Sequence, residues 1–166
     1  MMRLISALAW RWPLWALIAA ATLLGIAHAF ETFGHLSPCE LCLKQRDAYW
    51  AAMGVAAVGV ALSFTPVKAK HLVCLLLAGV FLTGAGVAVY QAGAEWKFWP
   101  GPSSCSGGGA VSMADLNRLL HGGPRTVVRC DQAAWIFLGL SMAGWNALIS
   151  IALAAMSLGA ARTRTP

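Results

Sequence analysis

The sequence predicts an all-α fold, an integral membrane four-helix bundle that forms a single domain over residues 1–166. Hydrophobic residues make up 59% of the chain and charged residues 11%, whereas soluble domains carry about 25% charged residues. Four stretches contain no Asp, Glu, Lys or Arg, and each is at least about as long as the ~20 residues that a helix needs to cross a bilayer. They are residues 12–30, 48–67, 71–94 and 132–161.

The charges predict how the bundle faces the membrane. Basic residues without acidic neighbours occur at both ends of the chain and between the second and third stretches, and all six acidic residues lie in or directly beside the other two loops. These basic residues are Arg3, Arg11, Lys68, Lys70, Arg162 and Arg164. Because Lys and Arg beside membrane helices stay on the cytoplasmic side, we expect both termini to be cytoplasmic and loops 34–47 and 94–132 to be periplasmic. The net charge of +6 is then a signal of topology, and nucleic acid is not expected as a partner.

The expected membrane helices cover approximately residues 13–33, 48–64, 71–93 and 133–160. The second helix begins near Cys39, ahead of its membrane part, and residues 65–70 form a tight turn. The first stretch has an alternative, because the sequence Ala27-His28-Ala29 imitates the cleavage site of a signal peptide. An uncleaved helix is preferred, since the apolar character continues to Phe33 and an even number of helices closes both outer loops.

The long loop 94–132 is expected to lie at the membrane surface. Trp96, Phe98 and Trp99 are the aromatic residues that membrane interfaces favour. Residues 112–120 begin with the pattern of a capping box and place apolar residues on one face, which predicts a short helix lying flat on the bilayer. The alternative for this loop is disorder.

Cys39 and Cys42 form a Cys-x-x-Cys pair at the start of the second helix. With Ser37 as the N-cap and Pro38 as the first helical residue, Cys39 lies in the first turn, where the helix dipole lowers the pKa of a thiol. A spacing of three residues puts both sulfur atoms on one face, within reach of a disulfide. Arg46, four residues after Cys42, is expected to favour the thiolate of Cys42.

Each of these features has a plainer interpretation. The pair is half of a zinc site if Cys105, Cys130 or His35 supplies further ligands, or it is a structural disulfide. Arg46 in the plainer view only extends to the lipid headgroups.

A second pair, Cys105 and Cys130, flanks the surface segment. A disulfide between them would contribute roughly 3–4 kcal/mol in the chain-entropy model, so a purely structural role is an alternative. The sequence Ser106-Gly107-Gly108-Gly109 leaves Cys105 accessible, which suits thiol–disulfide exchange. Cys74 is expected to be a small buried hydrophobic residue, and the four histidines show no ligand spacing.

Two thiol pairs near one membrane face predict a redox relay. A soluble dithiol would reduce the 105–130 disulfide, and the 39–42 disulfide would reoxidise that pair. The chain contains neither a Cys-x-x-Cys-His haem motif nor a dinucleotide-binding fingerprint. A lipid-soluble acceptor that reaches Cys42 from the bilayer fits best, and a quinone is the obvious candidate.

Three segments in combination form a highly specific pattern. They are Pro38-Cys39-Glu40-Leu41-Cys42-Leu43-Lys44-Gln45-Arg46, Trp99-Pro100-Gly101-Pro102-Ser103-Ser104-Cys105, and Cys130-Asp131 followed by Trp135-Ile136-Phe137-Leu138-Gly139-Leu140-Ser141-Met142 and Trp145. All three resemble the disulfide bond formation protein B (DsbB) family. The resemblance implies an enzyme of the bacterial inner membrane that reoxidises a periplasmic, DsbA-like thioredoxin-fold protein and reduces ubiquinone or menaquinone.

The same resemblance implies the roles of five residues. Cys105 forms the mixed disulfide with the partner, and Cys130 then exchanges with Cys39. Cys42 is the thiolate that contacts the quinone, and Arg46 supports it. The sequence departs from the family pattern in its Gly-rich stretch after Cys105 and in lacking, around Gln91, the histidine that some relatives carry near the quinone.

Other functions remain as alternatives. The four outer thiols would also serve a metal-binding membrane protein, although no metal ligand set is assigned, or a structural bundle whose loops are held by disulfides. A vitamin K epoxide reductase-like enzyme also joins a helical bundle to thiol chemistry, but the segments around Cys42 and Cys130 match the first family better.

Overall fold

The computed structural model describes residues 11–35, 38–67, 69–102 and 129–163. Within these ranges the chain forms four long helices and one two-stranded ribbon. The elements are α2 (Trp12–Thr32), α3 (Glu40–Leu62), α4 (Lys70–Glu95), β1 (Ile136–Phe137), β2 (Leu140–Ser141) and α6 (Met142–Arg162). The expected surface helix at 112–120 and Cys105 lie outside the described residues.

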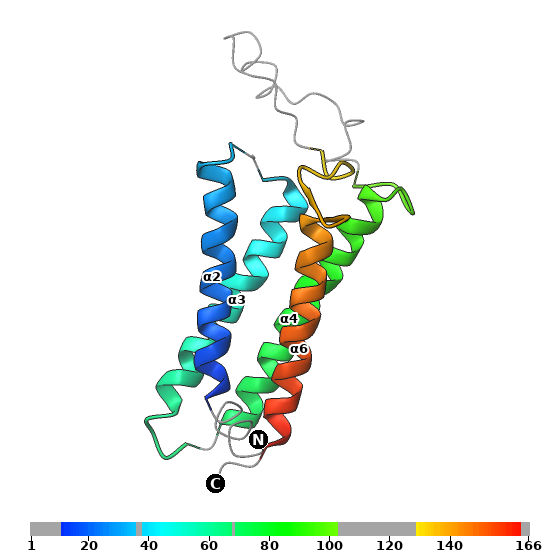
Figure 1. The fold of residues 1–166 in the computed structure, drawn as a ribbon. Coiled ribbons are helices and arrows are strands. Elements are labelled where there is room, and N and C mark those ends of the chain that lie inside the picture. Colours follow the sequence, from blue (N-terminus) through cyan, green and yellow to red (C-terminus); the bar gives the residue numbers. More distant parts are fainter. Residues whose placement is uncertain (1–10, 36–37, 68, 103–128, 164–166) are drawn as a thin grey trace.

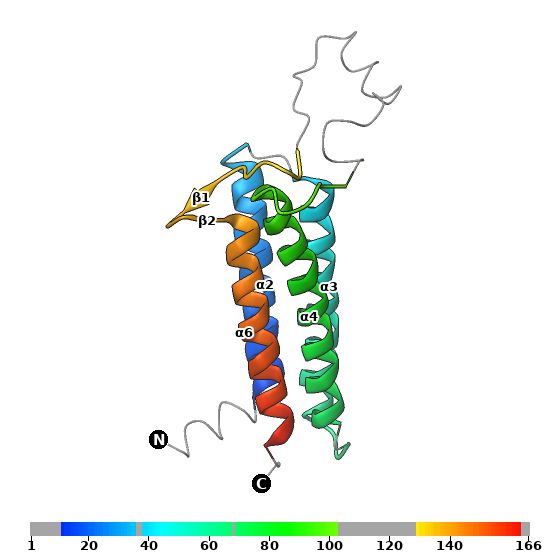
Figure 2. The same ribbon diagram turned by 90° about the vertical axis from the view of Figure 1, so that its right-hand side faces the viewer.

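The helices lie side by side and alternate in direction along the chain (Figure 1). Helix α4 packs mainly against α6 and α3, and α2 packs against α3. The start of α2, the α3–α4 connection and the end of α6 share one end of the bundle. The other end, called the thiol end below, holds the start of α3 with Cys39 and Cys42, against which Cys130 packs. The β1–β2 hairpin projects there beside the start of α6 (Figure 2).

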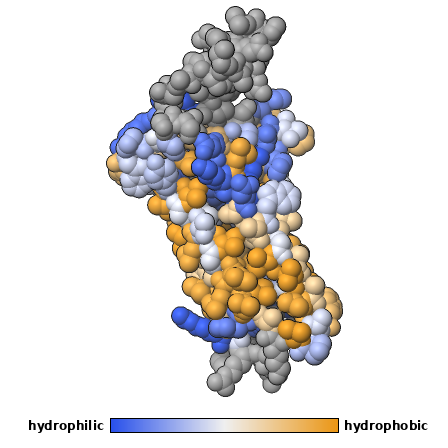
Figure 3. All heavy atoms as spheres, turned by 180° about the vertical axis from the view of Figure 1, so that it is seen from behind, coloured by the Kyte–Doolittle hydropathy of each residue, from blue (hydrophilic) through white to orange (hydrophobic). Residues whose placement is uncertain are grey.

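Three of the four described helices, α2, α4 and α6, are long and apolar enough to cross a membrane. Helix α3 differs because its first two turns contain Glu40, Lys44, Arg46 and Asp47, and its uncharged part begins only at Ala48. Figure 3 shows hydrophobic residues gathered over the middle and lower part of one face, with hydrophilic residues concentrated toward the thiol end. The three apolar helices α2, α4 and α6 make the chain a membrane protein.

Small side chains let the helices approach closely. Ala16, Ala52 and Ala88 are completely buried, while Phe81 and Leu77 are the largest of the fully buried side chains. A Cβ atom placed on Gly59 would lie 2.5 Å from Cγ1 of Val73, so the α3–α4 contact depends on the missing side chain. The polar contact between Trp12 Nε1 and Ser157 Oγ, at 2.9 Å, joins α2 to α6.

The fourth helix begins nine residues later than the expected residue 133. In its place Ile136 pairs with Ser141 and Phe137 with Leu140 in a tight hairpin. Leu138 and Gly139 both adopt positive φ angles, of 51° and 79°, which is the conformation that a two-residue hairpin turn requires. Helix α6 starts only where the Ser141 hydroxyl caps it by accepting from the Gly144 N–H at 3.1 Å.

The second helix also begins differently from the expectation. Cys39, in extended conformation, is the N-cap, and Glu40 is the first helical residue. The prediction that Ser37 caps this helix and that Cys39 lies inside its first turn is therefore wrong, and Ser37 itself lies outside the described residues. The sulfur of Cys39 replaces the expected hydroxyl, because it accepts the Cys42 N–H at 3.2 Å.

Candidate active site

The Cys39–Cys42 pair lies at the thiol end, ahead of the uncharged part of α3. Both residues are free thiols, and their sulfur atoms are 2.6 Å apart. A disulfide places its sulfur atoms 2.03–2.05 Å apart, so the pair can close into a disulfide once two electrons and two protons are removed. Cys39 is only 3% exposed, whereas Cys42 is half-buried. Cys42 is thus the more accessible sulfur of the pair.

The two thiols differ strongly in acidity. The hydrogen bond with Cys39 lowers the pKa of Cys42 to about 6; burial opposes this shift, and the contact with Gln91 supports it. The same hydrogen bond, together with burial, raises the pKa of Cys39 far above its ordinary value. Two adjacent sulfur atoms cannot both ionise easily, so one proton stays on Cys39 and the negative charge falls on Cys42. The expectation that the helix dipole makes Cys39 acidic is therefore wrong.

Cys130 completes a cluster of sulfur atoms. It is fully buried against Cys39 and Leu41, and Cys42 and Val87 pack around them. Cys130 is disulfide-bonded, and its partner in that bond lies outside the described residues. The structure therefore brings three of the four predicted site cysteines together. Cys74 is fully buried in the separate main core.

Arg46 contacts α2. Its Nη1 donates to Glu31 Oε2 at 2.5 Å, and its Nη2 donates to the Ala27 carbonyl at 3.1 Å. The side chain is 15% exposed. Among the described residues, the contacts that lower the pKa of Cys42 come from Cys39 and Gln91, and Arg46 is not one of them. In this structure Arg46 primarily joins α3 to α2.

Gln91 lies beside Cys42, a position that the sequence alone did not single out. It is buried on α4, and its Nε2 lies 3.6 Å from the Cys42 sulfur and 3.1 Å from Oε1 of Glu95. The other carboxylate oxygen of Glu95 is buried with no hydrogen-bond partner among the described residues. The available signal was the position itself, because polar side chains within a membrane helix are often functional.

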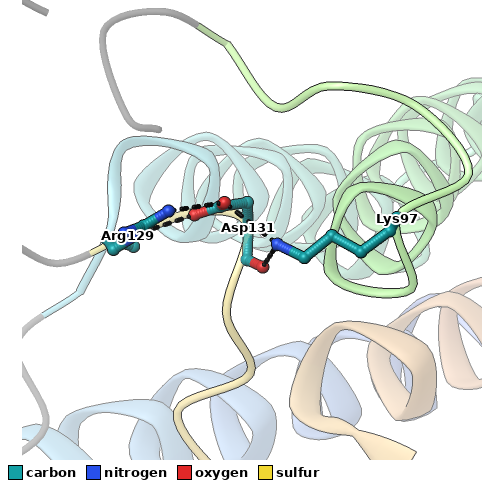
Figure 4. Close-up of polar contacts among 3 residues, drawn as sticks. All are labelled: Lys97, Arg129 and Asp131. Atoms are coloured by element: carbon teal, nitrogen blue, oxygen red, sulfur yellow. Dashed lines mark hydrogen bonds and ion pairs between the residues drawn. The ribbon is translucent and has the colours of Figure 1, made fainter. Parts of the chain in front are cut away.

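A charged cluster holds the segment that carries Cys130 (Figure 4). Lys97, after α4, donates to the Asp131 backbone carbonyl at 2.6 Å and to its carboxylate at 3.0 Å. Arg129 contacts both oxygens of the same carboxylate at 2.9 Å. The hydrogen bonds from Arg129 and then Lys97 hold the pKa of Asp131 well below its usual range. Cys130 thus lies between two residues that are tied to each other and, through Lys97, to α4.

The family model described as "Disulfide bond formation protein DsbB" matches residues 9–160. The chain belongs to the DsbB family. Disulfide bond formation protein B of Dechloromonas aromatica (strain RCB) is 31% identical over 143 residues, which cover 82% of either chain. The protein of the same name from Nitrosospira multiformis is 30% identical over 144 residues, covering 83% of this chain and 82% of that one. No solved structure matches the chain.

Membership of the DsbB family makes the chain a membrane oxidoreductase of disulfide bond formation. The thiol geometry is consistent with that assignment, since a buried cysteine cluster ends in one accessible and acidic sulfur. Within the described residues no group of three or more His, Cys, Asp and Glu side chains could hold a metal ion.

Proposed function

We propose that this DsbB-family protein reoxidises a periplasmic, DsbA-like thioredoxin-fold protein and passes the two electrons to ubiquinone or menaquinone. The protein then lies in the bacterial inner membrane with its thiol end on the periplasmic side. The observation that carries the proposal is the cluster in which disulfide-bonded Cys130 packs against Cys39, beside the acidic thiol of Cys42.

The electrons move by successive exchange of disulfides. The reduced partner transfers two electrons and two protons to a Cys105–Cys130 disulfide, with Cys105 forming the mixed disulfide. The Cys130 thiolate then attacks Cys39 of a Cys39–Cys42 disulfide, and Cys42 leaves as a thiolate. Attack by Cys105 on the Cys39–Cys130 bond restores the first disulfide and leaves Cys39 and Cys42 reduced. Because a leaving thiol of low pKa departs faster, the acidity of Cys42 favours this direction of exchange.

The residues around Cys42 fit a quinone. Such an acceptor needs an apolar approach and polar groups for its oxygen atoms. Leu43, the neighbour of Cys42, is 47% exposed, and the uncharged part of α3 begins five residues later, at Ala48. Arg46 is proposed as a quinone contact, because its guanidinium can donate to a quinone oxygen, and the unpartnered oxygen of Glu95 could accept from a hydroxyl of the reduced quinone. A bound quinone supplies the capacity to accept two electrons and two protons from the Cys39–Cys42 dithiol.

The test uses the purified full-length protein with a reduced thioredoxin-fold dithiol substrate and a soluble ubiquinone or menaquinone analogue. Quinol formation is followed by absorbance. Cys42→Ser is expected to abolish turnover, whereas Cys74→Ala, which changes a free thiol in the main core, retains it. Unchanged turnover in Cys42→Ser would refute the relay. Stoichiometric zinc or copper in the purified protein, without quinol formation, would favour the metal-binding alternative instead.

A further inference from the structure

A continuous chain of polar side chains crosses the bundle and ends at the Cys42 sulfur. It begins on α6, passes between α6 and α3 and reaches α4. Its contacts are Ser150 Oγ to Tyr49 hydroxyl at 2.9 Å, Tyr49 hydroxyl to Asn146 Oδ1 at 2.5 Å, Asn146 Nδ2 to Gln45 Oε1 at 2.5 Å, Gln45 Nε2 to Gln91 Oε1 at 2.7 Å and Gln91 Nε2 to Cys42 Sγ at 3.6 Å. Sequence reasoning assigned none of the five partner residues a role.

The chain has one consistent direction. The single proton of the Tyr49 hydroxyl goes to Asn146 Oδ1, so Tyr49 accepts from Ser150. The amide of Asn146 then has only its Nδ2 to offer to Gln45. Gln45 in turn donates through Nε2 to Gln91 Oε1. Each amide accepts on one side and donates on the other, so every donor in the chain points toward Cys42.

The side-chain amide of Gln91 therefore cannot rotate by 180° without losing hydrogen bonds. Exchanging the oxygen and nitrogen of Gln91 would set its NH₂ group against the NH₂ of Gln45, and a buried donor without an acceptor is costly. Gln91 Nε2 is thus held toward the Cys42 sulfur, with its second hydrogen available to Glu95 Oε1. Gln91 Oε1, 3.9 Å from the same sulfur, can accept from Cys42 when it is a thiol.

The charged and titratable groups around Cys42 show why the contact between Gln91 and the Cys42 sulfur matters for the thiolate. On α4, the carboxylate of Glu95 opposes ionisation of Cys42. At the start of α3, the buried thiol of Cys39 favours ionisation through its hydrogen bond with the Cys42 sulfur. The cation of Arg46 is bonded to Glu31 and Ala27 of α2. Helix α6 offers only neutral Asn146 and Ser150, and Cys130 is held in a disulfide. Neutral donors therefore stabilise the thiolate.

We propose that Gln91 is a positioning residue for Cys42, held in one orientation by Gln45, Asn146, Tyr49 and Ser150 so that its amide stabilises the thiolate. This inference rests on the proposed function only in treating Cys42 as the reactive thiol. The polar chain gives α6 and α4 a part in setting the reactivity of a cysteine on α3. It does so without a buried charge in the middle of the bundle.

The test measures the acidity of Cys42 directly. The full-length protein is reduced, exposed to iodoacetamide over pH 4–10 and analysed by peptide fragmentation, which separates Cys42 from Cys39. Gln91→Met keeps the length of the side chain and removes its donor and acceptor. Because hydrogen bonds to charged groups are among the stronger ones, the midpoint of Cys42 alkylation is expected to rise by about one pH unit. Asn146→Leu, which interrupts the chain farther away, is expected to raise it by less.

The control is Ser157→Ala, which removes a buried hydrogen bond between α6 and α2 outside the chain and is expected to leave the midpoint unchanged. An unchanged midpoint in Gln91→Met, or an equal rise in Ser157→Ala, would overturn the inference. Should Gln91→Met fail to fold, Asn146→Leu provides the test. An unchanged midpoint of Cys42 alkylation in Asn146→Leu would then overturn the inference. Alkylation requires neither partner nor quinone, so loss of quinone reduction in the wild-type protein would refute the proposed function and leave this test intact.

Discussion

Arg46 on α3 donates hydrogen bonds to the carboxylate of Glu31 and to the Ala27 carbonyl, both on α2. The guanidinium thereby joins the two helices one turn after Cys42 along α3. Because Arg46 is mostly buried and Glu31 is 40% exposed, the pair lies between a surface ion pair and a fully buried one. A change at Arg46 is therefore expected to act on the packing of α2 as well as on the redox site.

Replacing Arg46 by alanine tests both roles. Arg46→Ala removes the donor that Arg46 supplies to the Ala27 carbonyl and to the Glu31 carboxylate, and we expect it to lower the free energy of unfolding by about 1–3 kcal/mol. It is also expected to raise the KM for quinone, with an effect on quinone use that exceeds the effect on the fold. Thermal unfolding in detergent and quinone titrations measure the two effects.

The matched variant is Glu31→Gln, which keeps an oxygen acceptor for Arg46. Loss of this partly exposed ion pair is expected to cost less than about 1 kcal/mol and to leave the KM close to that of the wild-type protein. A KM for quinone that is unaltered in Arg46→Ala would contradict a role of the cation in quinone use. An unaltered free energy of unfolding in Arg46→Ala would contradict the stabilising contact between Arg46 and α2.

The wild-type protein should show a large difference in reactivity between its paired thiols. The pKa of Cys42 is lowered to about 6, so its thiolate forms as the pH rises through 6 and its alkylation levels off above about pH 7. The pKa of Cys39 is raised, so Cys39 stays protonated and unreactive over that range. Alkylation of Cys39 at a lower pH than Cys42 would contradict the assignment of the shared proton to Cys39. A midpoint of Cys42 alkylation near the ordinary pKa of a thiol would contradict it equally.

The apolar stretches located the long helices well, because charge is so costly inside a bilayer. Helix α2 was expected at 13–33 and runs from Trp12 to Thr32, and α4 was expected at 71–93 and runs from Lys70 to Glu95. The hairpin before α6 was missed because its residues are as apolar as the helix that follows. A short apolar run gives no period that separates strand from helix, and Gly139 was the only visible turn residue.

The geometry of the candidate site was predictable where it depends on neighbours along one helix. The proximity of Cys39 and Cys42 follows from their spacing of three. The spacing of Arg46 from Cys42 suggested a contact in the same way, but Glu31 on another helix binds the guanidinium. The chain from Ser150 to Gln91 joins three helices, so only tertiary packing brings its members together.

The close contact of α3 and α4 at Gly59 predicts a sensitive position. In Gly59→Ala the new methyl group would lie 2.5 Å from Cγ1 of Val73 and 3.0 Å from Cβ of Pro13, so the helices must move apart. We expect a loss of about 1–3 kcal/mol in the free energy of unfolding. Gly54→Ala on the same helix meets nothing within 4 Å and is expected to be neutral or to stabilise by up to about 1 kcal/mol. Equal free energies of unfolding for Gly59→Ala and Gly54→Ala would contradict the close packing at Gly59.

The contacts of Asp131 predict how strongly the Cys130 disulfide is protected. Cys130 is fully buried, and Asp131 next to it is bound by Lys97 and Arg129. Because the pKa of Asp131 is depressed, its carboxylate stays charged at neutral and mildly acidic pH, and the contacts are lost only below the ordinary pKa of Asp. Asp131→Asn weakens both contacts at every pH, so the segment carrying Cys130 should open more often.

The expected result is that dithiothreitol reduces the Cys130 disulfide severalfold faster in Asp131→Asn than in the wild-type protein. Peptide mapping of trapped thiols follows the reaction. Lys44→Gln serves as the control, because it breaks the exposed Lys44–Glu40 pair on the same end of the bundle and should not change the rate. The protecting role of Asp131 requires the faster reduction to persist between pH 6 and pH 8 once the thiolate fraction of the reductant is taken into account. Equal rates in wild-type and Asp131→Asn protein would mean that burial against Cys39 and Leu41 alone protects this disulfide.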